Sequence, residues 1–177
     1  MGPFVSHPRL SPEAVEARAY QLQAMDEALS GSMLLVLPTA AGKTAVAWMA
    51  IAERLETTTG WVLMIAPTVA LFNQHSVGTT PVLVGGSEVT PISISGQQPV
   101  AKRPDLWSYS RLVFATPQVV RNDVLRGTLS LAECSLLVVD EAHHCTGNHA
   151  MAQVAELYIS QSEDPLILAT TASPGSK

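Results

Sequence analysis

Short apolar segments alternate along this chain with longer segments in which apolar and polar residues are mixed. The apolar segments are four to six residues long and are bounded by glycine, proline or polar residues. Continuous apolar runs of this length are typical of strands that are buried on both faces of a parallel sheet. We therefore predict strands at residues 34–37, 61–66, 111–115, 135–139 and 166–170.

The mixed segments between these strands have the lengths and the end signals of helices. For the first helix, Ser11 is the expected N-cap and Gly31 the expected stop. Residues 81–95 alternate more weakly and predict one or two short strands, whereas the polar residues 97–110 predict a loop with one helical turn. Helices are predicted at residues 12–30, from residue 42 onward, and at 69–77, 118–126 and 150–160.

This alternation of strand and helix predicts an α/β domain with a mostly parallel sheet flanked by helices. In such domains ligands bind beyond the carboxyl ends of the strands. The polar clusters of this sequence follow predicted strands, and this shared placement itself indicates a site at that edge. We assign residues 13–177 to the domain and the proline-rich residues 1–12 to an extended N-terminal arm.

Composition narrows the class of protein. Hydrophobic residues make up 47% of the 177 positions and charged residues 14%, which predicts a globular chain with a sizeable core. Two cysteines do not make a disulfide framework, and Cys134 is expected to be a buried small side chain. Without a bilayer-spanning apolar run or a signal-peptide pattern, we expect no membrane partner and a cytoplasmic location. The net charge of −5 argues against a protein that grips nucleic acid mainly by charge, but it is compatible with contacts through amides and helix ends.

Residues 33–50 carry the first candidate site. An apolar strand ends at Pro38, and Gly42, Lys43 and Thr44 then open a helix, which is the layout of a phosphate-binding loop. The helix N-terminus presents unpaired N–H groups to a phosphate. The Lys43 side chain can reach the β- and γ-phosphates, and the Thr44 hydroxyl can ligate Mg²⁺.

The match to the general phosphate-loop pattern is incomplete. Leu37 stands where that pattern has glycine, and Ala40 and Ala41 fill positions that often carry glycine. An ordinary strand–turn–helix unit with a surface lysine is therefore the alternative that this loop alone leaves open.

A second candidate site follows the strand predicted at residues 135–139, which leads directly into Asp140 and Glu141. A nucleotide site needs one carboxylate to hold Mg²⁺ and another to orient the attacking water. Asp140 suits the metal and Glu141 suits the general base. A merely charged strand end is the alternative, which the joint presence of Asp-Glu-Ala-His and Gly-Lys-Thr disfavours. His143 is expected to bond across the sheet to residues 170–173 and to couple hydrolysis to movement.

The cluster of His143, His144, Cys145 and His149 consists of side chains that bind zinc in other proteins. Its spacing lacks the paired pattern of zinc sites, so we expect no zinc here.

Together these motifs resemble the first RecA-like domain of a superfamily 2 helicase, and more narrowly the branch of the archaeal Hef and Fanconi-anaemia M DNA translocases. The resemblance extends over nearly the whole chain and keeps seven motifs in the family's order. In chain order they are Arg18-x-Tyr20-Gln21, Leu37 to Thr44, Ala66-Pro67-Thr68 with Gln74, Ser95-Gly96, Ala115 to Gln118 with Asn122-Asp123, Asp140 to His143, and Thr171 to Gly175.

The resemblance implies a three-layer RecA-like fold, ATP and Mg²⁺ as cofactors, and a role for each motif. Arg18 and Gln21 would read the adenine, and Lys43, Asp140, Glu141 and His143 would form the catalytic centre. The phosphate loop would comprise Pro38, Thr39, Ala40, Ala41, Gly42, Lys43 and Thr44. Contacts to the backbone of one nucleic-acid strand would come from Pro67, Thr68, Gln74, Gly96, Thr116, Pro117 and Gln118.

Two positions depart from the family pattern. Ala40 stands where this branch usually has glycine, which would stiffen the loop, and Ala172 lies in a motif that reads Ser-Ala-Thr in many helicases.

The implied activity is that of an ATP-dependent helicase or translocase that acts on forked or branched DNA during repair and replication restart. A second RecA-like domain of the same polypeptide, not found in these 177 residues, would supply arginine fingers and close the ATP cleft. The 177-residue chain alone is therefore expected to bind nucleotide weakly, to hydrolyse ATP very slowly and not to unwind DNA.

Two alternatives remain open. One is a double-stranded RNA sensor or Dicer-type ATPase of the same superfamily. The other is a catalytically silent nucleotide-binding scaffold, against which the intact Lys43, Asp140 and Glu141 argue.

Overall fold

The computed structural model describes residues 33–37, 40–65, 92–139 and 149–172, and every structural statement below concerns these residues. The helices predicted at residues 12–30 and 69–77 lie outside them.

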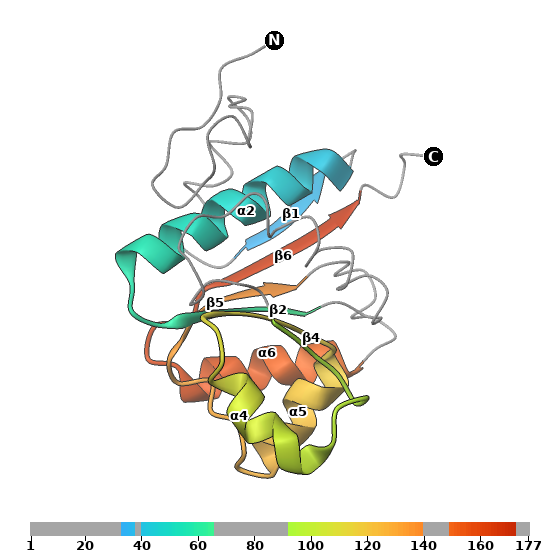
Figure 1. Ribbon diagram of the computed structural model, residues 1–177. Coiled ribbons are helices and arrows are strands. Elements are labelled where there is room, and N and C mark those ends of the chain that lie inside the picture. The colour runs from blue at the N-terminus through green and yellow to red at the C-terminus, as the bar shows by residue number, and fades with distance from the viewer. Residues whose placement is uncertain (1–32, 38–39, 66–91, 140–148, 173–177) are drawn as a thin grey trace.

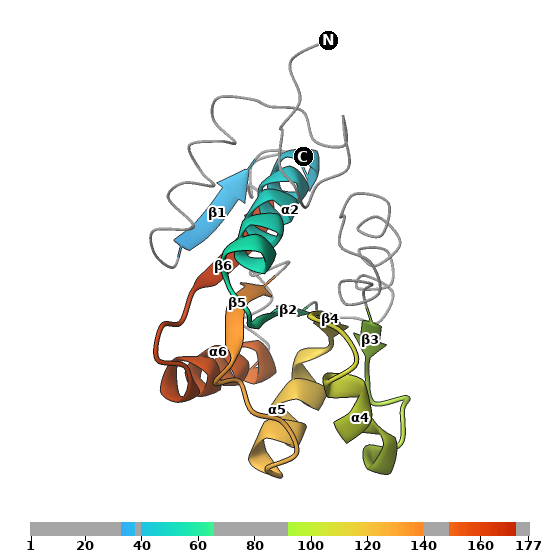
Figure 2. The same cartoon turned by 60° about the vertical axis from the view of Figure 1, so that its left-hand side comes forward.

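The described strands form one parallel sheet of six strands in the order β1-β6-β5-β2-β4-β3 (Figure 2). This order confirms the predicted parallel α/β architecture, because every neighbouring pair runs in the same direction. The strands are β1 Met33–Leu37, β2 Trp61–Ile65, β3 Ile92–Ile94, β4 Leu112–Ala115, β5 Cys134–Val139 and β6 Ile167–Ala172.

Helices cover both faces of the sheet and give the three layers that the resemblance implied. Figure 1 shows α2 on one face, whereas α4, α5 and α6 lie on the other. The helices are α2 Ala40–Thr57, α4 Arg103–Trp107, α5 Pro117–Leu125 and α6 His149–Gln161, and a 3-10 turn, η2, spans Val100–Lys102.

The strands β2, β4 and β5 are as deeply buried as their apolar sequences predicted. Every residue of β4 and β5 is buried, as are all residues of β2 except its first. Their side chains on one face pack against α4, α5 and α6. This core includes Val113 of β4, Leu137 of β5 and Tyr158 of α6, which is wholly buried. A sheet with both faces covered has such strands because neither face meets water.

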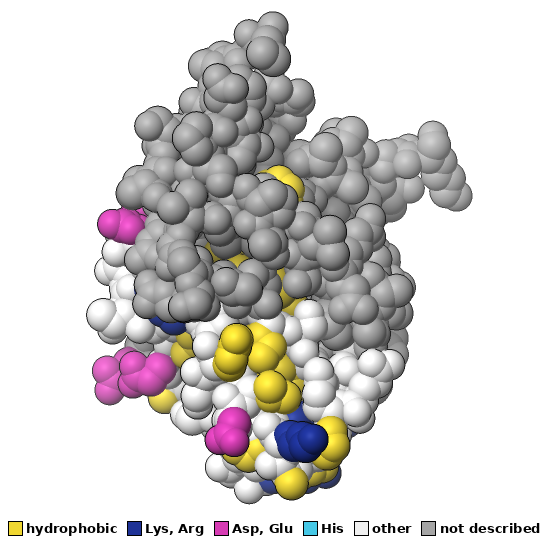
Figure 3. All heavy atoms as spheres, viewed as in Figure 1, with side chains coloured by type: hydrophobic (Ala, Val, Ile, Leu, Met, Phe, Trp, Pro, Cys, Tyr) yellow, Lys and Arg dark blue, Asp and Glu magenta, His cyan; other side chains and the backbone are white. Residues whose placement is uncertain are grey.

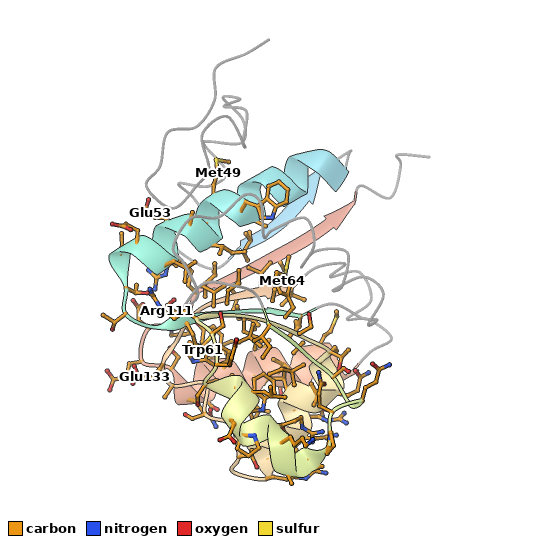
Figure 4. The ribbon with its side chains drawn as sticks, viewed as in Figure 1. Met49, Glu53, Trp61, Met64, Arg111 and Glu133 are labelled. Carbon is orange, nitrogen blue, oxygen red and sulfur yellow. The ribbon has the colours of Figure 1, made fainter. Side chains whose placement is uncertain are left out.

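Two arginines anchor the end of α2 to the amino-terminal ends of the strands. Arg111, which precedes β4, donates hydrogen bonds from Nη2 to the carbonyl oxygens of Thr58 (2.7 Å) and Leu55 (3.1 Å). Arg54 Nε donates to the carbonyl oxygen of Ser135 (3.0 Å). Cations that bind the last carbonyls of a helix complement its dipole. This anchor fixes the direction of α2, whose other end begins the phosphate motif, and Figure 4 shows Arg111 below the far end of the helix.

Several predicted boundaries need correction. The helix expected to open at Gly42 begins two residues earlier, at Ala40. The polar residues 97–110, predicted as a loop with one turn near residues 105–109, instead hold η2 followed directly by α4. Hydrophobic periodicity missed these elements because their buried residues include a charged one, Arg103.

Cys134 is buried at the start of β5, as its apolar context predicted. Burial raises the pKa of its thiol to about 12, so this cysteine stays protonated and unreactive at neutral pH.

Within the described ranges, no helix is both long enough and apolar enough to cross a membrane.

Candidate nucleotide and nucleic-acid site

The two nucleotide motifs belong to strands that lie on either side of β6. In the parallel register, Leu37 of β1 is aligned with Ala172 of β6, and Val139 of β5 is aligned with Ala169. Adjacent strands are about 4.8 Å apart, so β1 and β5 lie about 10 Å from each other. The arrowheads of β1, β5 and β6 point to the same side of the molecule in Figure 1. The phosphate motif after β1 and the acidic motif after β5 therefore start from the same edge of the sheet.

The phosphate motif lies at the start of a long helix. Only residues 38–39 separate β1 from α2, whose first five residues are Ala40 to Thr44. The first N–H groups of a helix have no intrahelical acceptor and carry the positive end of the dipole. The backbone at the start of α2 therefore fits the binding of a phosphate chain, and Lys43 and Thr44 belong to this first stretch.

The remaining nucleotide residues lie outside the described ranges. These predictions are the adenine contacts Arg18 and Gln21, the loop residues Pro38 and Thr39, and the motif residues Asp140, Glu141 and His143.

The predicted nucleic-acid contacts are described in part, and the described ones occupy neighbouring strand ends. Ile94 of β3 is aligned with Ala115 of β4, so the Ser95–Gly96 turn and the Thr116–Pro117 segment follow these strands at the same level. Pro67, Thr68 and Gln74 lie outside the described residues. The structure thus brings together two of the three predicted contact segments at the β3 side of the sheet.

The first turn of α5 carries backbone N–H groups without an acceptor inside the helix, next to Thr116, which is 9% exposed. Thr116 caps the helix with extended backbone, and its side chain makes no hydrogen bond to the helix. Pro117 is the first helical residue and has no N–H to donate, which suits this position. The exposed Gln118 and the amide groups of the first turn follow it. Hydroxyl and N–H groups of this kind bind phosphate without reading the base.

Gly96 lies in an exposed turn that is built by its neighbours. The Ser95 N–H donates to Gln98 Oε1 (2.7 Å), and Gln98 Nε2 donates to the carbonyl oxygen of Ser93 (2.9 Å). A Cβ added at Gly96 would meet no heavy atom within 4 Å. Glycine is therefore not required here for packing, and its backbone remains open to a ligand.

A buried polar network behind this edge escaped the sequence prediction. Arg103, Trp107 and Asp123 meet between α4 and α5, where Asp123 accepts from both of the other side chains. Burial alone would raise the pKa of Asp123, but the hydrogen bonds from Arg103 and Trp107 and the positive charge of Arg103 outweigh it, so this pKa lies below its usual value. Arg103 and Trp107 are four residues apart, so they lie on one face of a helix. This spacing is the feature of the sequence that could have predicted that the two side chains act together.

In the part of the chain that the structure describes, neither a metal-binding cluster nor the cavity at the opposite edge of the sheet coincides with this site. Among the described residues no group of three or more His, Cys, Asp or Glu could hold a metal ion. A cavity of about 500 Å³ opens at the amino-terminal ends of the strands, beside Trp61, Tyr109 and Glu133. None of the predicted site residues lines it.

The sequence matches a helicase family and is similar to individual helicases. The family model for DEAD/DEAH box helicases matches residues 18–177. The chain is 40% identical over 173 residues to a putative ATP-dependent RNA helicase of Methanocaldococcus jannaschii, covering 98% of this chain and 22% of that protein. It is 35% identical over 177 residues to the DEAD-box ATP-dependent DNA helicase Fancm of Drosophila melanogaster. This match covers 96% of this chain and 12% of that protein.

A solved structure gives the same result. The crystal structure of the Pyrococcus furiosus Hef helicase domain superimposes with a TM-score of 0.86 at 36% identity, over 96% of this chain and 35% of that one. This match confirms the RecA-like fold, and together with Fancm it confirms the resemblance to the Hef and Fanconi-anaemia M branch. The chain spans about a fifth or less of the two relatives. It belongs to the DEAD/DEAH box helicase family.

Proposed function

We propose that this chain is the first motor domain of an ATP-dependent DNA helicase or translocase. The observation that carries the proposal is the shared sheet edge. There Gly42, Lys43 and Thr44 lie in the first turns of the helix that follows β1, and β5, two strands away, leads into Asp140 and Glu141. A phosphate-binding helix start and a pair of carboxylates are the two halves of an NTPase site, and here they follow strands that are two positions apart in one sheet.

Each residue has a distinct task in the proposed hydrolysis. The N–H groups at the start of α2 and the Lys43 ammonium hold the phosphate chain. Thr44 and Asp140 would hold Mg²⁺, which would supply positive charge beside the phosphates. Glu141 accepts a proton from the attacking water, and His143 connects this centre to the end of β6. The adenine is held by Arg18 and Gln21.

Nucleic acid binds at the other half of the same edge. Gly96 and the segment from Thr116 to Gln118 follow the neighbouring strands β3 and β4, so the uncharged donors of the Gly96 turn and of the first turn of α5 lie at the same edge of the sheet. Such donors suit a phosphate backbone and fit a protein of net charge −5, because they need no basic surface. Pro67, Thr68 and Gln74, which lie outside the described residues, are assigned further contacts by the family resemblance alone.

Movement requires a second RecA-like domain that closes over the nucleotide. The 177-residue chain alone then binds ATP weakly and hydrolyses it very slowly. Robust DNA-stimulated ATP hydrolysis by this chain alone would contradict this part of the proposal.

The substrate is DNA in preference to duplex RNA. Fancm, a relative matched over 96% of this chain, is named a DNA helicase, although the M. jannaschii relative is named an RNA helicase. A double-stranded RNA-dependent ATPase is therefore the second candidate function, and forked DNA is the structure on which we expect the protein to act.

Replacing Gly96 with alanine tests the nucleic-acid edge. The added methyl group meets open space, so we expect the free energy of unfolding to stay the same or to rise by about 0.4–1 kcal/mol. The same methyl group obstructs a phosphate, so affinity for fluorescent forked DNA should fall about tenfold, which is about 1.4 kcal/mol. Fluorescence anisotropy and urea unfolding of the same preparations measure both effects.

The control is Thr57→Ala at the far, exposed end of α2, which should change neither the affinity nor the fold. Unlabelled forked DNA and duplex RNA are then compared as competitors. If duplex RNA displaces the probe better than forked DNA, the substrate is RNA. Unchanged affinity in Gly96→Ala would remove this turn from the binding edge.

A further inference from the structure

Arg103 and Asp123 form a buried ion pair with two parallel hydrogen bonds. Arg103 Nε lies 2.7 Å from Asp123 Oδ2, and Arg103 Nη2 lies 2.8 Å from Asp123 Oδ1. The side chains are only 5% and 0% exposed. Trp107 Nε1 donates a third hydrogen bond to Asp123 Oδ2 (2.8 Å). The pair therefore has one fixed geometry, since every bond direction is defined by a planar group.

The same arginine holds the turn that contains Gly96. Its remaining amino group, Nη1, donates to the carbonyl oxygen of Gln98 (3.0 Å). The Gln98 side chain in turn closes the turn through Ser95 and Ser93. A continuous chain of hydrogen bonds thus runs from Asp123 through Arg103 and Gln98 to the residue that precedes Gly96.

The other end of this chain belongs to the helix that starts at Thr116. Asp123 is the seventh residue of α5, and its main-chain oxygen also accepts the N–H groups of Thr128 and Leu129. Because α5 is one continuous helix of nine residues, a contact that fixes Asp123 also fixes the position of its first turn. The ion pair therefore connects the two described segments of the nucleic-acid edge from behind.

Stability alone does not explain such a pair. Replacing a buried ion pair by apolar side chains of similar volume is often neutral or stabilising, because both charges lose hydration when they are buried. What a bidentate pair supplies is a defined geometry. At this place the geometry is the spacing between the Gly96 turn and the Thr116 helix start.

We propose that Arg103 and Asp123 are positioning residues, which set the distance between the Gly96 turn and the start of α5 so that both contact consecutive phosphates of one strand. The proposal rests on the nucleic-acid edge proposed above. It adds that the edge is a preorganised unit, held by a buried tie that touches no nucleic acid itself.

The test removes the hydrogen bonds among Arg103, Trp107 and Asp123, which we call the tie, and keeps the apolar packing around them. In the triple variant Arg103→Met, Trp107→Phe, Asp123→Leu, all three polar partners become apolar together, so no buried charge or indole N–H is left without its acceptor. Arg103→Lys is the second variant: it keeps a positive charge beside Asp123 but cannot bond Asp123 twice and Gln98 at once. Folding of each variant is checked by circular dichroism and urea unfolding.

Amide hydrogen exchange reports the turn without any nucleic acid. In both variants the N–H groups of Ser95, Gln97 and Gln98 should exchange at least about tenfold faster, while those of β4 and β5 keep their protection. Unchanged exchange at the turn in the folded variants would overturn the proposal, whatever the affinity for DNA.

Binding of fluorescent single-stranded DNA gives the functional result. Affinity should fall about tenfold in the triple variant and by a smaller factor in Arg103→Lys, while affinity for a fluorescent ATP analogue stays unchanged. Tyr158→Phe is the control, because it removes buried hydrogen bonds to Cys134 and Leu166 on another part of the core and should leave DNA affinity as it was. If exchange rises but the variants bind DNA as tightly as the unmodified chain, the positioning role is wrong. If exchange rises and the unmodified chain binds no DNA, the proposed nucleic-acid edge is wrong and the tie remains.

Discussion

Replacing Glu141 with glutamine is expected to slow ATP turnover by at least about a hundredfold, because a positioned general base typically contributes 10²–10⁴ to the rate. Glutamine keeps the size of the side chain but cannot accept the proton of the attacking water. ATP binding should change little, since the phosphate contacts come from α2 and Lys43. Turnover is measured as phosphate release by the complete protein with DNA present, and nucleotide affinity is measured separately.

Glu133→Gln is the matched control. Glu133 is exposed and precedes the same strand, β5, at its amino-terminal end, so the identical chemical change is made at the opposite edge of the sheet. Turnover in this variant should equal that of the unmodified protein. Glu141→Gln turning over at an undiminished rate would show that Glu141 is not the base.

Replacing Arg103 with leucine should lower the free energy of unfolding at neutral pH by about 3–5 kcal/mol, because it leaves the Asp123 carboxylate buried without its partner. Arg126→Leu is the control. Arg126 also pairs with Asp123, at 3.3 Å, but its side chain is 49% exposed, so its loss should cost at most about 1 kcal/mol. The free energies of unfolding of the unmodified chain, Arg103→Leu and Arg126→Leu are measured by urea unfolding.

The free energy of unfolding should depend on pH with opposite signs in the unmodified chain and in Arg103→Leu. In the unmodified chain the pKa of Asp123 is lowered, so the stabilisation by the pair is present above the unfolded value of about 3.9 and is lost as pH falls through the folded value. In Arg103→Leu the buried carboxyl without its partner should have a raised pKa, so lowering the pH stabilises the fold relative to neutral pH. The difference in free energy of unfolding between the unmodified chain and Arg103→Leu should therefore become smaller at acidic pH. A loss below about 1 kcal/mol at pH 7 would contradict the buried pair.

The parts of the fold that follow from local sequence were predictable. The strands β2, β4 and β5 were found because their apolar runs are buried on both faces, and β1 and α2 because a strand, a short turn and Gly-Lys-Thr follow one another, although α2 begins two residues before Gly42. The order of the strands was not predicted, since it depends on contacts between distant segments. Only the sheet order reveals that the phosphate motif and the acidic motif are two strands apart.

The proposed nucleic-acid edge rests on segments that the sequence named, and nucleic-acid binding there stays a prediction. The segments at Gly96 and Thr116 were identified from their motif resemblance, and the structure adds that they follow adjacent strands. The tie behind them was missed because Arg103 lies in a polar, proline-containing stretch that predicted a loop. Its partner Asp123 is 20 residues away and faces it only after α4 and α5 have packed.

Nucleotide binding at the start of α2 is the central claim, and a titration with a fluorescent ATP analogue in the presence of Mg²⁺ tests it most directly. The 177-residue chain should bind weakly but saturably, and removal of Mg²⁺ should weaken the binding. Lys43→Ala should lose at least about tenfold in affinity, because a cation bound to the phosphates is removed, whereas Glu141→Gln should bind as the unmodified chain does. Equal affinity of Lys43→Ala and the unmodified chain would contradict the assignment of this helix start as the ATP site.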